Sequence, residues 1–167
     1  MKKFKKYKNI YKLEINRPDF FHFHHGANKI DGDDREFKLH LHPFPEIYIY
    51  INGKADFYIS GTTYRLNPYD VILVPPNTLP QPRPTVGETF ERFVVNIPSS
   101  FYTLMNCPEY EDVFLKLSNF EYKIPGHITK RSGILNFVNF FYNEYNPNAK
   151  YMETLMLNKI MDLLYSL

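Results

Sequence analysis

Cysteine is nearly absent from this sequence, which has only Cys107 among its 167 residues. A single cysteine excludes an internal disulfide, and no histidine stands near it in the sequence to activate the thiol as a nucleophile. Tryptophan is missing altogether, and no apolar run reaches the length of a secretory signal or a membrane span. We therefore expect a cytoplasmic protein in a reducing setting, with no membrane anchor.

Glycine is also scarce, and the seven residues are too scattered to form a phosphate-binding loop. The sequence has no Ser/His/Asp pattern of a hydrolase either.

Acidic residues are missing from the first twelve positions, which hold six lysines, so the rest of the chain has 14 basic and 18 acidic side chains. A domain with this negative balance is a poor partner for nucleic acid. We interpret residues 1–15 as a basic arm, of the kind that is usually solvated.

Aromatic residues are abundant, with 14 Tyr and 15 Phe, so the core must be rich in rings. From about residue 10 to residue 97 the sequence reads as short strands separated by turns, which is typical of an all-β sandwich or barrel. The clearest strand is 46–51, in which Glu46, Tyr48 and Tyr50 share one face and three isoleucines share the other. Because both faces are largely apolar, we expect both to be covered.

The pattern becomes helical after Pro98, and we interpret residues 108–167 as a helical region. Apolar residues recur at helical spacing from Ile134 to Tyr145 and again from about Ala149 onwards, which predicts an antiparallel helical pair. The second helix is apolar around so much of its circumference that it needs two partners, one on its own domain and one elsewhere. It is either an ordinary core helix or a helix that also contacts a second copy of the chain, and we favour the second interpretation. The residues predicted to form this homodimer contact are Leu157, Ile160, Met161 and Leu164. The apolar pattern continues to the last residue, as expected of one part of a longer polypeptide.

The segment HLHPFPE, residues 40–46, has the residue types of a metal site. His40 and His42 are two apart, so on a strand their side chains point to the same side, and Glu46 begins the next strand. Two imidazoles and one carboxylate suit Fe(II), Mn(II) or Zn(II), with positions left open for a substrate. A metal-dependent enzyme is therefore one interpretation of these residues.

The same segment, followed by six residues and then Gly53, resembles the first conserved motif of the cupin barrels. In the place of the second cupin motif, Asp70 and Pro75 match, but Pro80 stands where the family has a histidine that completes the metal site. Proline offers no ligand atom, so only three candidate ligands remain. The resemblance implies a mainly β fold with C-terminal helices, in which a cupin-type double-stranded β-barrel (jelly roll) precedes the helical pair. We predict no bound metal and no other cofactor.

Residues 37–97 as a whole look like the N-terminal sensing domain of AraC-type transcription regulators, and the helices after Lys130 are similar to the dimerising linker of that family. The resemblance implies that residues 16–107 form a barrel that binds a small effector, often a sugar, without catalysis. Carried over by position, the implied ligand-binding residues are His40, His42, Glu46, Tyr48 and Arg92. DNA would be bound only through a helix-turn-helix domain, and we expect no such domain within these 167 residues.

Three functions remain open at this point. The first is the effector-sensing and dimerisation domain of an AraC-type regulator. The second is a metal-dependent cupin enzyme, such as a dioxygenase or an isomerase, that uses His40, His42 and Glu46. The third is a stand-alone binding module for which dimerisation is the purpose. We favour the first, because Pro80 removes the usual fourth ligand and the terminal helices suit a sensing domain.

A second histidine group lies in Phe21-His22-Phe23-His24-His25, where His22 and His24 share one strand face. No carboxylate or cysteine stands close to this group in the sequence, so we expect an exposed edge strand and not a metal site. His127 has no evident partner.

Overall fold

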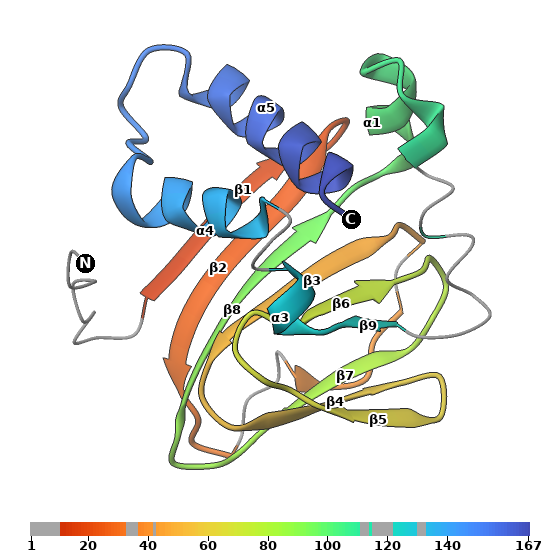
Figure 1. Ribbon diagram of the computed structural model, residues 1–167, viewed down its shortest axis with the longest axis vertical. Helices are drawn as coiled ribbons and strands as arrows, with labels where there is room; N and C mark the ends of the chain where they lie inside the picture. The colour runs from red at the N-terminus through yellow and green to blue at the C-terminus, as the bar shows by residue number, and fades with distance from the viewer. Residues whose placement is uncertain (1–10, 33–36, 42, 111–113, 115–121, 130–132) are drawn as a thin grey trace.

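The computed structural model describes residues 11–32, 37–41, 43–110, 114, 122–129 and 133–167. These residues form two antiparallel β-sheets packed on each other, with helices on the outer side of the larger sheet (Figure 1). The larger sheet has the strand order β1-β2-β8-β3-β6-β9, and the smaller sheet has the order β5-β4-β7. Within the described residues no strand pairing joins the two sheets. The β-barrel expected from the sequence is therefore not closed by hydrogen bonds between its two sheets.

The strands of the larger sheet are β1 (Tyr11–Arg17), β2 (Phe21–Lys29), β3 (Glu46–Asn52), β6 (Val71–Val74), β8 (Thr89–Asn96) and β9 (Lys123–Ile124). Those of the smaller sheet are β4 (Ala55–Ile59), β5 (Thr62–Arg65) and β7 (Pro80–Pro84). The helices are α1 (Ser99–Leu104), the 3₁₀ turn η2 (Pro108–Tyr110), α3 (Gly126–Thr129), α4 (Ile134–Asn143) and α5 (Met152–Tyr165). α4 and α5 run in roughly opposite directions over the sheet (Figure 1), as the helical periodicity predicted.

β1 begins where the strand pattern was expected to begin, at about residue 10, whereas β9 lies outside the region in which strands were expected. β1 starts at Tyr11, inside the stretch 1–15 that was interpreted as a basic arm, and residues 1–10 lie outside the described part. β9 pairs with β6 as the edge of the larger sheet, although it falls in the region 108–167 that was interpreted as helical. A strand of two residues leaves too short a pattern to recognise in a sequence.

The alternation predicted for β3 is confirmed. Ile47, Ile49 and Ile51 belong to the core under the helices, whereas Tyr48 and Tyr50 belong to the core between the sheets. All six residues from Glu46 to Ile51 are buried, as expected of a strand that is covered on both faces. β8 has the same two-faced pattern, and this pattern places its side chains alternately toward the helices and toward the smaller sheet.

The C-terminal helices bury their apolar stripes against the larger sheet. Of the four residues predicted to form a dimer contact, Ile160 is fully buried and Leu164 is 2% exposed, both within the core of the chain itself. Leu157 and Met161 are partly exposed at the edge of that core. Only Leu157 and Met161 therefore have exposed area that could contact a second copy of the chain, and the dimer remains a prediction.

Asp70 connects the turn before β6 to the segment that carries β9 and α3. Its carboxylate, 1% exposed, accepts hydrogen bonds from the backbone N–H groups of Asn67 at 2.9 Å and Gly126 at 2.7 Å. The Lys123 ammonium lies 3.3 Å from the same carboxylate. A buried carboxylate with three donors is fully compensated, so Asp70 is a structural residue.

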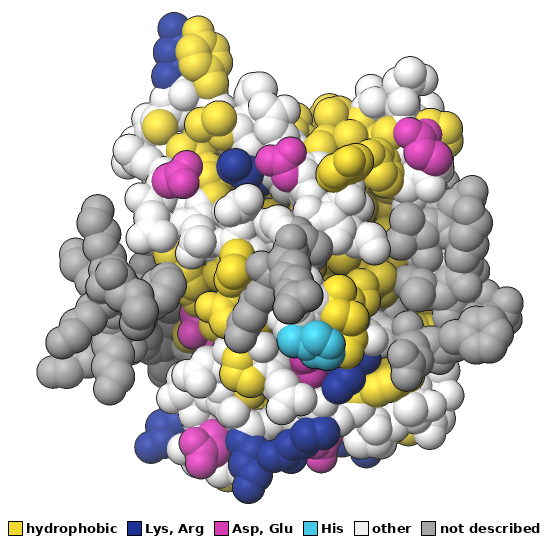
Figure 2. All heavy atoms as spheres, in the orientation of Figure 1, with side chains coloured by type: hydrophobic (Ala, Val, Ile, Leu, Met, Phe, Trp, Pro, Cys, Tyr) yellow, Lys and Arg dark blue, Asp and Glu magenta, His cyan; other side chains and the backbone are white. Residues whose placement is uncertain are grey.

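Charged side chains lie at both ends of the molecule. Figure 2 shows Lys and Arg side chains beside Asp and Glu at the end formed by the smaller sheet and also at the helical end, where hydrophobic side chains lie among them. The exposed large hydrophobic residues of that second end are Leu104, Tyr151, Leu155 and Tyr165. In the part of the chain that the structure describes, no helix has the length and apolar character needed to span a bilayer.

Candidate functional site

A cavity of about 280 Å³ lies between the two sheets, beside the strands β1, β2, β8 and β3. Its lining residues are Glu14, His22, His24, Phe37, His40, Glu46, Tyr48, Pro82, Arg92, Val94 and Asn96. Four of the five residues predicted to bind a ligand, His40, Glu46, Tyr48 and Arg92, are among them. The fifth, His42, lies outside the described residues. The structure thus brings these four together around one space, and their role in binding remains a prediction.

Strand pairing arranges the floor of this cavity in rows. Read across β2, β8 and β3, the rows are His22-Asn96-Glu46, His24-Val94-Tyr48 and Gly26-Arg92-Tyr50. Successive rows are two residues apart along a strand, so the first and third are separated by about 13 Å. The carboxylate of Glu46 and the guanidinium of Arg92 therefore belong to opposite ends of the cavity.

Arg92 is a deeply buried charge, only 2% exposed. Its Nη1 donates a hydrogen bond to Oδ1 of Asn28 at 2.5 Å. The guanidinium carbon lies 5.0 Å from the ring centre of Phe37 and 5.5 Å from that of Phe90, within the range of a cation–π contact. These contacts hold the side chain on the floor of the cavity.

Gly26 makes room for the two basic side chains of the cavity floor. A Cβ atom at this position would lie 2.8 Å from Nη1 of Arg92 and 2.8 Å from Nε2 of His24. Real Cβ atoms do not approach nitrogen atoms so closely, so any larger residue would displace both side chains. A glycine inside a strand commonly marks such a close approach.

The other predicted residues differ in how they reach the cavity. Glu46 and Tyr48 are almost completely buried in β3, and the Tyr48 ring meets Phe57 of the smaller sheet edge-on at 4.9 Å. His40 is exposed and lies in an irregular segment before β3, where its Nδ1 is 2.9 Å from the backbone oxygen of Lys38. The expectation that His40 stands on a strand is therefore wrong, and the two-residue alternation does not apply to it.

The sequence interpretation missed the contribution of β2 to the site. This strand lies between β1 and β8 and is not an edge, so the expected exposed edge strand is wrong. His22 and His24 both line the cavity, and Nε2 of His22 lies 3.0 Å from Oε1 of Glu14 on β1. The alternation of aromatic residues and histidines from Phe21 onwards was the available signal, since it marks a strand with one apolar and one polar face.

The metal site suggested by HLHPFPE has no match in the described part of the chain. Within those residues no three His, Cys, Asp or Glu side chains come close enough together to hold a metal ion. His40 and Glu46 both line the cavity, and His42 is outside the described residues. The donor set that is described therefore does not fit a three-ligand metal ion.

A second polar group lies on the opposite face of the same sheet, under α4. His25 is 2% exposed, stacks on Phe93 at 3.8 Å, and its Nε2 lies 2.9 Å from Oε1 of Glu91. The hydroxyl of Tyr142 on α4 donates a hydrogen bond to the same oxygen. Burial acts to raise the pKa of Glu91, but the hydrogen bonds from His25 and Tyr142 and the charge of His25 outweigh it and hold the pKa below its usual value. Glu91 thus anchors α4 to the strand that carries Arg92.

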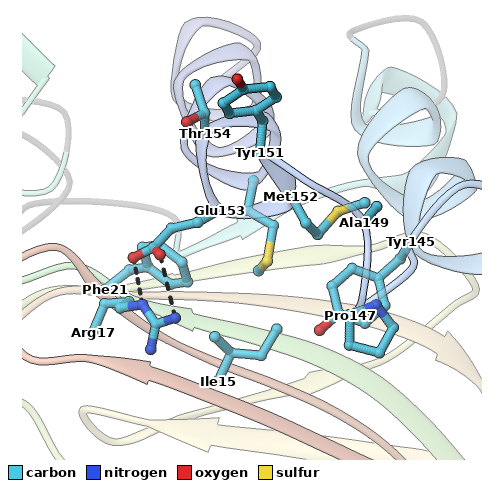
Figure 3. Close-up of a pocket in the computed structure, with 11 residues that line it drawn as sticks. Ile15, Arg17, Phe21, Tyr145, Pro147, Ala149, Tyr151, Met152, Glu153 and Thr154 are labelled. Atoms are coloured by element: carbon cyan, nitrogen blue, oxygen red, sulfur yellow. Dashed lines mark hydrogen bonds and ion pairs between the residues drawn. The ribbon is translucent and has the colours of Figure 1, made fainter.

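Another cavity, of about 410 Å³, lies on this helical side between β1, β2 and the start of α5 (Figure 3). Arg17 and Glu153 point toward each other across it, with Nε and Oε1 at 2.5 Å. Both side chains are about half exposed, so the pair contributes little to stability. None of the residues predicted from the sequence to bind a ligand lines this cavity.

The chain has a cupin-like antiparallel β-sheet fold with C-terminal helices, which confirms the predicted fold class. Residues 29–104 match the family model described as the AraC-like ligand binding domain. The match covers less than half of the chain, and it leaves out β1 and most of β2, with His22 and His24. No curated protein sequence gives a significant match. The family match and the fold support a domain that binds a small molecule.

Several solved structures are similar to part of the chain. A cupin superfamily protein from Desulfitobacterium hafniense has 14% identity and a TM-score of 0.45, over 54% of this chain and 78% of that one. A cupin 2 conserved barrel domain protein from Salinispora arenicola has 19% identity and a TM-score of 0.45, over 65% and 84%. A DMSP lyase from Ruegeria pomeroyi has 22% identity and a TM-score of 0.44, over 53% of this chain and 47% of the lyase.

Proposed function

We propose that the chain is the effector-sensing and dimerisation part of an AraC-type transcription regulator. The observation that carries this proposal is the cavity between the sheets, which collects His40, Glu46, Tyr48 and Arg92. Imidazole, carboxylate, phenol and guanidinium groups supply both donors and acceptors for a small polar ligand, and aromatic rings supply a face. A carbohydrate is the effector class that the family resemblance favours. In this proposal the regulator acts in the cytoplasm, and DNA is bound by a helix-turn-helix domain outside residues 1–167.

The proposed mechanism is a population shift. A ligand that binds one arrangement of sheets and helices better than another moves the equilibrium by the difference in affinity. The larger sheet suits this role, because the cavity lies on one of its faces and the helices α4 and α5 pack on the other. The dimer contact in this proposal is made by Leu157 and Met161, the two predicted residues that keep exposed surface.

A cavity-filling variant tests ligand binding. Val94 lines the cavity and is partly exposed, so Val94→Phe occupies the ligand space whatever the chemistry of the ligand. Val86→Phe is the matched control, because Val86 is 62% exposed outside the cavity. In a thermal-shift screen against a metabolite library that includes sugars, we expect compounds that raise the midpoint of the wild type and of Val86→Phe but not of Val94→Phe. A library without any such compound, or an unchanged shift in Val94→Phe, would contradict the proposal.

The dimer is tested by sedimentation. Leu157→Glu introduces a charge into the proposed contact, and Leu104→Glu introduces the same charge at a residue that is 56% exposed on α1. We expect only Leu157→Glu to lower the sedimentation coefficient to that of a monomer, with circular dichroism as a check of folding. A monomeric wild type at tens of micromolar contradicts this part of the proposal.

The rival function is a metal-dependent cupin enzyme that uses His40, His42 and Glu46. Metal analysis of protein purified without added metal distinguishes the two functions. Stoichiometric Fe, Mn or Zn that is lost in His40→Ala and kept in His127→Ala would favour the enzyme. We expect no difference in metal content between the two variants, because the described donors do not converge on one point.

A further inference from the structure

We propose that the ligand is an elongated molecule with a polar and an apolar part, and that Asn96 hydrogen-bonds to it where the two parts join. The polar part lies in the cavity between the sheets, and the apolar part lies in a neighbouring cavity of about 450 Å³. This assignment rests on the function proposed above, because it describes the ligand of the same cavity. It is narrower than that function, since a small ligand confined to the cavity between the sheets would satisfy the function and not the assignment.

The two cavities share part of their walls. Glu14, His22 and Asn96 line both of them, so the two spaces adjoin along these three residues. Ligand cavities in proteins usually measure about 300–1,000 Å³. The cavity between the sheets, of about 280 Å³, lies at the lower limit of that range, whereas the two cavities together lie well inside it. A ligand that fills the available space therefore extends through both.

The residues that the cavities do not share differ in chemistry. On the side of the cavity between the sheets they include polar groups of every kind, namely His24, His40, Glu46, Tyr48 and Arg92. In the neighbouring cavity they are Asn16, Pro18, Phe21, Phe44 and Pro98, four of them apolar. Aromatic rings and prolines favour an apolar group of a ligand, because its surface is removed from water there. The ligand therefore has one polar end and one apolar end.

Asn96 has an acceptor atom that the described part of the chain does not use. Its Oδ1 is buried, and within the described residues it accepts no hydrogen bond. Such an atom lowers stability, and most buried polar atoms of native proteins have a partner. The side chain lines both cavities, and a turn of the amide about its last bond brings the oxygen to the cavity surface. A hydroxyl or amino group of the ligand then donates the missing hydrogen bond.

Compounds of two lengths test the assignment on the folded 167-residue chain. The probes are D-glucose with phenyl β-D-glucopyranoside, D-galactose with phenyl β-D-galactopyranoside, and L-alanine with L-phenylalanine. Any library compound that binds is added with and without its apolar part. We expect calorimetry to give at least a tenfold tighter dissociation constant for the longer compound of a pair that binds, because its ring buries apolar area. Phe44→Ala should reduce this ratio to about one. Leu41→Ala, which shortens a 60% exposed side chain that lines neither cavity, should keep it.

Asn16→Trp fills the neighbouring cavity and leaves the cavity between the sheets unchanged. Asn16 is exposed on β1 and lines the neighbouring cavity but not the cavity between the sheets. We expect the longer compound to lose at least tenfold in affinity, while the shorter compound keeps its affinity within about threefold. Thr63→Trp introduces the same ring at an exposed position on β5 and should change neither affinity.

Asn96→Leu removes the amide and keeps a similar volume. Since Oδ1 has no hydrogen bond to lose within the described residues, we expect the midpoint of thermal unfolding without ligand to stay within about 2 °C of the wild type or to rise. Both members of a pair should nevertheless bind at least tenfold more weakly, because both lose the hydrogen bond to the amide. Asn158→Leu, at an exposed position on α5, should leave both affinities unchanged.

The outcomes separate this assignment from the function on which it rests. Equal or weaker binding of the longer compound, or an advantage that survives in Phe44→Ala and Asn16→Trp, overturns the elongated ligand. Wild-type affinity in Asn96→Leu, or a marked fall of its midpoint without ligand, overturns the role of Asn96. In each of these cases the cavity keeps its proposed function if Val94→Phe abolishes the binding that is observed. If no probe and no library compound binds, both proposals are wrong.

Discussion

Replacing Tyr142 with phenylalanine removes one hydroxyl group from the contact between α4 and the larger sheet. That hydroxyl donates to Oε1 of Glu91, a carboxylate whose side chain is 16% exposed and which also faces His25. The ring of Tyr142 keeps its edge-on contacts with His25 at 5.6 Å and with Phe93 at 5.8 Å. The substitution therefore removes the hydrogen bond to Glu91 and changes almost no packing.

The expected size of the effect follows from the charge of the acceptor. A hydrogen bond to a charged group contributes about 1.5–3 kcal/mol to stability, more than one between neutral groups. In a chain of this length a loss of about 2 kcal/mol lowers the midpoint of thermal unfolding by about 4–8 °C. Tyr165→Phe removes the same atom from a ring that is 81% exposed, and we expect its midpoint to stay within about 1 °C of the wild type.

The pH dependence provides the stricter test. The pKa of Glu91 is lower in the folded protein than in the unfolded chain, so its ionisation stabilises the fold at neutral pH, and this contribution is lost as the pH falls through the folded-state pKa. The difference in midpoint between the wild type and Tyr142→Phe should therefore be largest near pH 7 and should shrink at acid pH. A difference that does not shrink as the pH is lowered through the titration of Glu91, or one no larger at pH 7 than that of Tyr165→Phe, would refute this account of Glu91.

Three further predictions concern stability and reactivity. Asp70→Asn should destabilise the protein by about 3 kcal/mol in urea unfolding, because its backbone and ammonium donors lose their charged acceptor. Gly53→Ala should lower the free energy of unfolding by at least about 2 kcal/mol more than Gly61→Ala. Both glycines have positive φ, but only at Gly53 would a Cβ clash with a backbone atom, the carbonyl oxygen of Thr89. Cys107 is 4% exposed, and burial, with the charge of Glu109, raises the pKa of its thiol. A disulfide reagent should therefore label it only as fast as the chain unfolds, and rapid labelling of the folded protein would contradict its burial.

Local patterns explain the parts of the fold that were predictable. The faces of β3 follow from the alternation along six residues, which needs no knowledge of the neighbouring strands. Glu46 and Tyr48 belong to one face of this strand, so any cavity on that side must include them. Arg92 was placed by family resemblance, and its partners Asn28 and Phe37 were not foreseen, because neither is near it in the sequence.

Features that depend on distant pairing were not predictable in the same way. The histidines of β2 line the cavity because this strand pairs with β8, which places His22 beside Asn96 and His24 beside Val94. The sequence of β2 does not say which strands lie beside it. Helical periodicity identified the apolar stripe of α5, but it cannot tell which side of a stripe meets the sheet. Ile160 and Leu164 were therefore predicted at a dimer contact, although both are buried in the core that the helices share with the larger sheet.

The alternation of side chains along β8 couples the two faces of the larger sheet, because neighbouring residues of this strand face opposite sides. A substitution at one position changes one face only and does not show this coupling. Glu91 faces the helices and Arg92 faces the cavity, and only the register of β8 against β2 and β3 decides which is which. A slip of one residue would send the arginine into the contact with α4 and the glutamate into the cavity, reversing the sign of the charge in both places. An insertion or deletion within β8 would therefore alter the charge in the cavity and the attachment of α4 together.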